Sequence, residues 1–167
     1  LHEICFKTNL DYDNLLLPFD IEALIAHGEM LGECGLISKE DAALIVSSLK
    51  LMQEDAVSGK LAMSIEWEDC HSLIEAKLIE RCGDAGKRLY MARSRNDQVV
   101  SATRLYGRQQ VETILSKVKL FMESLLNFSK KYEMVPMAGY THTQRAMPAS
   151  VGMWASSFLE VLLNQKA

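Results

Sequence analysis

The sequence predicts an all-α fold, and three observations predict it. Apolar residues recur at spacings of three and four over most of the 167 residues, the pattern of amphipathic helices. No segment shows the apolar–polar alternation of a strand, and no glycine-rich nucleotide loop appears. The three prolines, Pro18, Pro136 and Pro148, stand at the edges of periodic segments. We therefore expect five helices.

The first 93 residues are expected to form a small helical domain with three of these helices. The first helix begins near Asp20, and the second opens at Ser38, which forms a capping-box arrangement with Asp41. The third runs from about Glu66 to Cys82 and ends at Gly83, a left-handed cap.

Residues 94–167 are expected to begin a central helical bundle. A long helix over about 96–134 carries two neighbouring apolar stripes and a polar back, as bundle helices do. The stripes are Val111, Leu115, Val118, Met122 and Leu125, and Ile114, Val118, Phe121, Leu125 and Phe128. A loop follows, and a fifth helix begins near Ala149. Such a wide apolar face has no complete partner within one chain, so we expect an oligomer.

Composition excludes several classes of protein. With 49% hydrophobic and 24% charged residues, the chain is neither disordered nor of low complexity. No apolar run approaches the roughly 20 residues of a membrane span. A net charge of −4 gives no electrostatic argument for nucleic acid. Four dispersed cysteines and no export signal indicate small, buried, reduced thiols in a cytoplasmic protein.

The segment 93–98, Arg-Ser-Arg-Asn-Asp-Gln, does not look like an ordinary connector. Asn96 or Asp97 could cap the long helix, which would explain one residue of six. Two arginines beside a helix N-terminus also form a good carboxylate receptor, because paired guanidinium donors and free backbone N–H groups converge there.

The segment 139–145 is the second unusual connector, and it contains His142. A lone loop histidine is more often an inert surface residue. Here two hydroxyls, an amide and an arginine flank it, which favours a functional site.

Glu68, His71 and Glu75 would share one face of the third helix. Glu-x-x-His is half of a di-iron signature, but no other histidine follows a glutamate at that spacing. We therefore expect no metal and no cofactor. The alternative interpretation is an exposed polar stripe on an amphipathic helix.

Taken together, these segments resemble the argininosuccinate lyase family of the fumarase/aspartase superfamily. The resemblance is carried by 68–75 (EDCHSLIE), 83–87 (GDAGK), 92–98 (ARSRNDQ) and 139–148 (GYTHTQRAMP), and more weakly by 20–37. It covers essentially the whole chain, which would be roughly the first third of a family member. The Ser-Arg-Asn-Asp and Gly-Tyr-Thr-His-x-Gln segments are specific only in combination.

The resemblance implies an elimination that splits argininosuccinate into arginine and fumarate. A proton leaves a carbon beside a carboxylate, so donors preorganised around that carboxylate stabilise the transition state. His142 would be the acid/base histidine or the residue that orients the base. Substrate-binding roles would fall on Asn9, Asp13, Asp69, His71, Arg95, Asn96, Thr141 and Gln144. The resemblance also implies arginine biosynthesis, a cytoplasmic homotetramer and active sites built from several subunits.

Three departures from the family pattern keep alternatives open. Asn9 stands where the family usually has serine, and Tyr90-Met91 where it has His-Thr. The loop that carries the family's catalytic serine lies beyond these residues, so we expect the chain to be inactive alone. One alternative is a relative that releases fumarate from another N-substituted aspartate. The other is a non-catalytic, crystallin-like relative.

Overall fold

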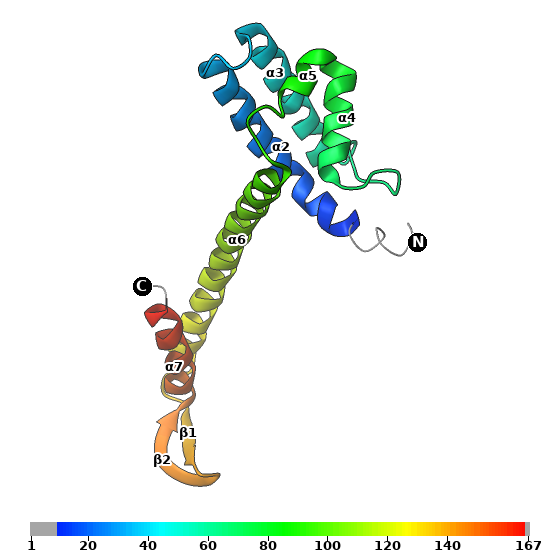
Figure 1. Cartoon of the computed structure of the whole chain (residues 1–167). Helices are drawn as coiled ribbons and strands as arrows, with labels where there is room; N and C mark the ends of the chain where they lie inside the picture. The colour runs from blue at the N-terminus through cyan, green and yellow to red at the C-terminus, as the bar shows by residue number, and fades with distance from the viewer. Residues whose placement is uncertain (1–9, 166–167) are drawn as a thin grey trace. The chain divides into compact units, whose positions relative to one another are not determined.

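The computed structural model describes residues 10–165. They fall into two compact units, of which unit 1 ends at Gln109 and unit 2 begins at Gln110. The described residues contain six helices and one two-stranded sheet (Figure 1). The helices are α2 (Leu10–Glu33), α3 (Lys39–Val57), α4 (Cys70–Cys82), α5 (Asp84–Arg88), α6 (Arg95–Lys131) and α7 (Val151–Asn164). The helical fold class is thereby confirmed. The predicted domain boundary at residue 94 stays a prediction.

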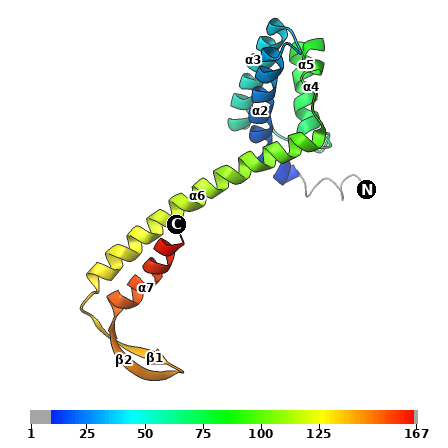
Figure 2. The same ribbon diagram turned by 60° about the vertical axis from the view of Figure 1, so that its left-hand side comes forward.

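Unit 1 holds the hydrophobic core, with α2, α3, α4 and α5 side by side (Figure 2). Its central side chains are wholly or almost wholly buried: Leu17, Ile21, Leu24, Leu31, Ile45, Leu49, Met52, Leu73, Ile74, Leu78 and Leu89. Each such side chain contributes about 1.5–3 kcal/mol by leaving water. Where α6 begins, Ala102 is buried and the Tyr106 ring meets Phe19 edge to face at 5.6 Å.

The first helix is longer than predicted, because α2 runs from Leu10 straight through Pro18. Proline removes a backbone hydrogen-bond donor and crowds the preceding turn of a helix. The sequence therefore favoured a helix that begins after Pro18. Leu17 and Ile21, on either side of Pro18, are buried in the core. Their burial outweighs the local cost of the proline.

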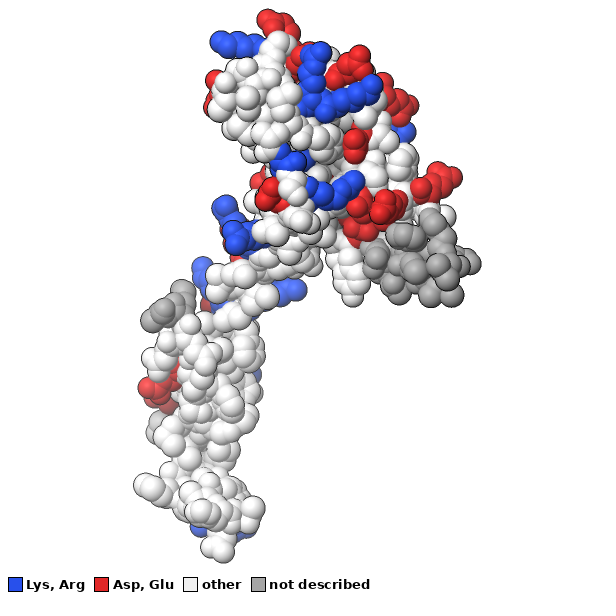
Figure 3. Space-filling model, in the orientation of Figure 1, with Lys and Arg blue, Asp and Glu red and all other residues white. Residues whose placement is uncertain are grey.

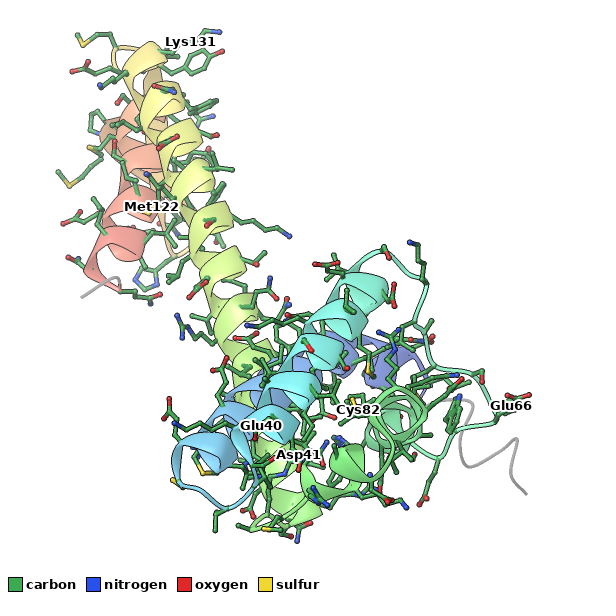
Figure 4. All side chains as sticks on the ribbon, turned by 90° about the horizontal axis from the view of Figure 1, so that it is seen from above. Glu40, Asp41, Glu66, Cys82, Met122 and Lys131 are labelled. Atoms are coloured by element: carbon green, nitrogen blue, oxygen red, sulfur yellow. The ribbon has the colours of Figure 1, made fainter. Side chains whose placement is uncertain are left out.

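The predicted start of α3 is confirmed, because the Ser38 hydroxyl accepts a hydrogen bond from the Asp41 N–H at 3.0 Å. The predicted start of the third helix is wrong. The α4 helix begins at Cys70, and Glu66 lies in the segment before it (Figure 4). Asp69 is its N-cap and forms a reciprocal capping box with Ser72.

This shorter helix also corrects the proposed polar face, because Glu68 is not helical and cannot share a helix face with His71 and Glu75. Gly83 ends α4, as predicted, but its φ of +58° and ψ of −132° differ from those of the predicted left-handed cap. The short helix α5 follows it and makes the sixth helix, where five were predicted.

The long helix α6 begins and ends close to the predicted positions. Its first turn is capped differently. The Ser94 hydroxyl accepts from the Asn96 N–H at 3.2 Å, and the Asp97 carboxylate accepts from the Ser94 N–H at 3.1 Å. Ser94 and Asp97 therefore satisfy donors at this helix start, whereas Asn96 does not cap it with its side chain.

The connector predicted as a loop is a β-hairpin in unit 2, which corrects the expectation of no strand. Strand β1 (Pro136–Thr141) pairs antiparallel with β2 (Gln144–Ser150). The pairing Thr141–Gln144 leaves a two-residue turn, His142–Thr143, with φ of +50° and +62°. Two positive φ values are the geometry of a type I′ turn, which favours hairpins. Histidine and threonine are not the residues typical of this turn, so the sequence did not predict it. Non-glycine residues at this geometry store local strain.

Helix α7 starts at the Ser150 N-cap and lies along the end of α6, as both ribbon views show (Figures 1 and 2). The Gly152 N–H donates to the Tyr132 carbonyl at 3.0 Å. A Cβ on Gly152 would lie 2.5 Å from the Ser129 carbonyl oxygen, so this contact requires glycine.

Two further findings concern the described residues: their lack of a membrane-spanning helix and the state of their cysteines. None of the described helices is long and apolar enough to cross a membrane. Cys34, Cys70 and Cys82 are free thiols, as predicted, but only Cys70 is fully buried and Cys34 is exposed.

Candidate active site

A pocket of about 370 Å³ opens on unit 1 and is rich in acidic side chains. Its lining comes from the start of α2, the segment before α4, the first turn of α4 and α6. The lining residues are Tyr12, Asp13, Leu16, Glu68, Asp69, His71 and Val99. Three of the predicted substrate-binding residues, Asp13, Asp69 and His71, therefore meet in one pocket. Asn9 lies outside the described residues.

The two aspartates of the pocket differ in their electrostatic environment. Burial, and then the nearby charge of Asp69, raises the pKa of Asp13 above its usual value. Burial also acts on Asp69, but hydrogen bonds from Ser72 and the charge of Arg95 outweigh it and lower its pKa. Asp69 is thus held as an anion, while Asp13 binds its proton more readily. Neighbouring carboxyl groups with diverging pKa values are typical of ligand-binding and catalytic sites.

Arg95 is tied to this pocket through Asp69. Its Nη1 donates to both carboxylate oxygens, at 3.0 and 2.9 Å. Arg95 remains about half exposed, so a second carboxylate can approach the guanidinium. Asn96 is the next residue of α6 and is exposed. Of the residues predicted to form a carboxylate receptor, Arg95 and Asn96 are therefore exposed at the start of α6, and their binding role stays a prediction.

Arg93 and Gln98, of the same segment 93–98, pack into unit 1. Burial lowers the pKa of Arg93, and its side chain lies over the Tyr90 ring at 5.6 Å. Gln98 is buried and donates to Asp20 at 2.8 Å. Both residues point into unit 1 rather than serve an exposed receptor.

Beneath the pocket lies a buried polar group that the sequence reasoning missed. Asp20 is wholly buried, and its Oδ2 lies 2.6 Å from His71 Nδ1. A signal was present, since Asp20 occupies the apolar stripe of α2 between Leu17 and Leu24. A carboxylate on a core-facing position is rare unless it is paired.

Asp20, Cys70 and His71 offer three metal-ligand atoms within 4.8 Å of one another. Their arrangement does not fit an ion. Ligand bonds of about 2.0–2.1 Å in a tetrahedral site place ligand atoms roughly 3.3 Å apart. The 2.6 Å separation of Asp20 and His71 is a hydrogen bond instead. Burial and nearby carboxylates also raise the pKa of Cys70, which disfavours the thiolate that a metal needs.

The remaining predicted residues lie together on the hairpin of unit 2. Thr141 and Gln144 face each other as the last strand pair, and His142 begins the turn between them. All three are exposed. The structure thus groups the predicted residues into two sets. Asp13, Asp69, His71, Arg95 and Asn96 belong to unit 1, whereas Thr141, His142 and Gln144 belong to unit 2.

Comparisons with known proteins identify the family of the chain. A family model described as "Lyase" matches residues 6–167. The chain is 42% identical over 152 residues to an argininosuccinate lyase of Sorangium cellulosum, which covers 91% of this chain and 35% of that protein. It is 40% identical over 162 residues to an argininosuccinate lyase of Lachnospira eligens, covering 97% of this chain and 35% of that protein. The chain therefore spans about a third of the length of these curated relatives, in their N-terminal part.

Solved structures show the same fold. EDDS lyase in complex with formate matches with a TM-score of 0.76 and 25% identity, over 91% of this chain and 29% of that chain. A fumarate lyase:delta crystallin from Brucella melitensis matches with a TM-score of 0.76 and 15% identity, over 93% of this chain and 39% of that chain. With the fold of the fumarase/aspartase superfamily and a family model matched over nearly all of its length, the chain belongs to the lyase family.

Proposed function

We propose that the protein carrying this chain is a carbon–nitrogen lyase that splits argininosuccinate into arginine and fumarate by elimination. The observation that carries the proposal is the acidic pocket of Asp13, Asp69 and His71, adjoining the Arg95 guanidinium. Similarity to curated argininosuccinate lyases at 40–42% identity supports it. The reaction would be a step of arginine biosynthesis.

The chemistry divides between the two ends of the substrate. At the fumarate end, a proton leaves the carbon beside a carboxylate, and negative charge builds on that carboxylate. Arg95, Asn96 and Thr141 would hold this end, because their donors stabilise that charge more in the transition state than in the substrate. A substrate carboxylate would share or take over the Arg95 donors that Asp69 now accepts.

At the other end, the leaving group carries a guanidinium. Carboxylates match the planar donor set of a guanidinium better than any neutral group does. Asp69 is held as an anion by Ser72 and Arg95. Asp13 would become fully ionised once a cationic group lies beside it. Gln144 and Asn9 would add polar contacts to the substrate.

His142 would move or orient the proton. It is exposed at a strained hairpin turn in unit 2, with Thr141 directly before it. Backbone strain of this kind clusters at functional sites, which favours a functional role for His142. The acid/base role of His142 is carried over from the family resemblance.

We further propose a homotetramer in the cytoplasm, with each active site built from several subunits. Along α6 and α7, large apolar side chains remain exposed, among them Val111, Ile114, Leu115, Phe121, Trp154, Phe158 and Val161. The face shown in Figure 3 carries few charges over unit 2, which holds the later part of α6 and all of α7. Exposed apolar surface of this kind is typical of an oligomer interface. The free thiols among the described residues support a reducing compartment.

The test is a steady-state assay of the full-length protein with argininosuccinate beside other N-substituted aspartates. We expect argininosuccinate to have the highest kcat/KM, and we expect no fumarate from the 167-residue chain alone. A better substrate than argininosuccinate would leave the lyase class standing and remove the named activity.

A second candidate is release of fumarate from another N-substituted aspartate. It is favoured by Asn9 and Tyr90-Met91, where the sequence departs from the family pattern, and by the 25% identity to EDDS lyase. Tyr90 is partly buried against the core of unit 1, and its ring lies beside Arg93. A protein without turnover of any such substrate would fit the crystallin-like alternative instead.

A further inference from the structure

We propose that Asp20 is a positioning residue of this site, which acts through His71. Asp20 would hold the His71 ring with its proton on Nδ1 and so present Nε2 to the pocket as the atom that meets the substrate. The inference rests on the proposed function in one respect, that this pocket is the substrate's.

The geometry makes His71 Nδ1 a hydrogen-bond donor to Asp20. Its distance to Asp20 Oδ2 is 2.6 Å, and both side chains are buried. A carboxylate only accepts hydrogen bonds, so the proton must sit on Nδ1. Gln98 Nε2 donates to the same oxygen at 2.8 Å and fixes the carboxylate from the other side. The Asp20 carboxylate is thus clamped between two donors.

Nε2 is then the free atom of the ring. His71 lines the pocket together with Asp13 and Asp69. None of the described residues is seen to bond its Nε2, whereas Nδ1 is engaged. With Nδ1–H held by Asp20, Nε2 is the ring atom that can meet a ligand. The ring therefore offers the pocket either a lone pair or an N–H at one defined place.

Stability alone does not explain Asp20. Its second oxygen, Oδ1, is buried without a hydrogen-bond partner among the described residues, as are Tyr90 Oη and Arg93 Nη2. A half-satisfied buried carboxylate is unfavourable in a core that could hold an apolar residue instead. Local conflicts of this kind are expected where function requires them.

The first experiment measures the His71 tautomer directly. The sequence has four histidines, so ¹⁵N-histidine labelling of the chain gives four imidazole spin systems, of which that of His71 is assigned with His71→Gln. Long-range ¹H–¹⁵N spectra distinguish a protonated from an unprotonated ring nitrogen. At a pH where His71 is neutral, we expect its proton on Nδ1. A proton on Nε2 in the unmodified chain overturns the inference, and this measurement needs no variant to fold.

The same spectra of Asp20→Asn show how the tautomer of His71 depends on the Asp20 carboxylate. The new amide can donate to Nδ1, so we expect a population with the proton on Nε2 to appear. Asp41→Asn is the matched control, because it makes the same change at an aspartate that pairs with Arg88 instead. An unchanged tautomer in a folded Asp20→Leu chain, in which the side chain at position 20 offers Nδ1 no acceptor, contradicts the proposal.

Kinetics of the full-length protein separate positioning from mere stability. We expect Asp20→Asn to lower kcat/KM tenfold or more. Because Asp20 acts through His71, the double variant Asp20→Asn/His71→Gln should be no slower than His71→Gln alone. Additive losses would overturn the proposal. If the unmodified protein does not turn over argininosuccinate, the proposed function fails, while the tautomer measurement still decides this inference.

Discussion

Arg95 Nη1 donates to both carboxylate oxygens of Asp69, at 3.0 and 2.9 Å. The contact joins the first residue of α6 to the N-cap of α4. Asp69 thus serves two purposes, since it caps one helix and holds an arginine at the start of another. A change at Asp69 is therefore expected to act on stability and on binding in separable ways.

Substitution of Asp69 separates these purposes. Asparagine is as good an N-cap as aspartate, so Asp69→Asn should lower the free energy of unfolding only through loss of the partly exposed ion pair with Arg95. Asp69→Ala removes the cap and should lower it by about 1 kcal/mol. Urea unfolding of the chain, followed by circular dichroism, checks both values. Equal losses for the two variants would show that the cap is not what Asp69 contributes.

Arg95→Lys should lower kcat/KM of the full-length protein for every substrate alike. Lysine keeps the charge but lacks the planar donor set that suits a carboxylate. The matched control is Arg104→Lys, an exposed arginine further along α6, which should have no effect. Selective loss with one leaving group only would place Arg95 at the wrong end of the substrate.

Asp13→Asn should weaken argininosuccinate turnover roughly tenfold or more, because a charge-assisted hydrogen bond worth about 1.5–3 kcal/mol is lost. Asp11→Asn, on the same helix turn and exposed, is the control. Turnover that survives Asp13→Asn would remove this residue from the site.

Asp13 should also give the chain a defined pH dependence of stability. Its pKa is raised from 3.8 in the folded state, so the folded chain binds this proton more tightly than the unfolded chain. Stability from this group is therefore present below the unfolded value and declines as pH rises through the folded one. The free energy of unfolding of Asp13→Asn should lack this decline. Urea titrations at a series of pH values will show whether the two curves differ.

Glycine substitutions test the packing of α7 on α6. Gly152→Ala would place a Cβ 2.6 Å from Glu133 Cα, so we expect a loss of about 1–3 kcal/mol from overpacking. Gly107 also lies in a helix, but a Cβ there meets nothing within 4 Å. Gly107→Ala should therefore stabilise the chain by up to about 1 kcal/mol. Thermal unfolding of both variants makes the comparison, and similar effects would contradict it.

Much of this protein is determined by the sequence itself. Helix periodicity and local caps are short-range properties, so the segments of α3, α6 and α7, the Ser38 cap and the Gly83 terminator could be predicted without tertiary structure. The specific segments around Arg95 and His142 likewise identified the family. These signals lie within a few residues of one another, where sequence reasoning works best.

Tertiary structure decided the rest. Helix α2 continues through Pro18 because Leu17 and Ile21 are buried in the core. Local sequence rules count only the cost of the proline, so they end or begin a helix there. Strand pairing makes a hairpin of the segment around His142, although its turn residues do not favour positive φ.

The pocket itself belongs to this second group. Asp20 and His71 are 51 positions apart in the sequence, and only packing brings Oδ2 within 2.6 Å of Nδ1. Gln98, which lies on a third helix, α6, donates a hydrogen bond to the same oxygen. A helix pattern records which face is apolar, but it does not record which polar group is buried opposite another. That pairing depends on contacts between elements, and it is what converts a set of motifs into a site.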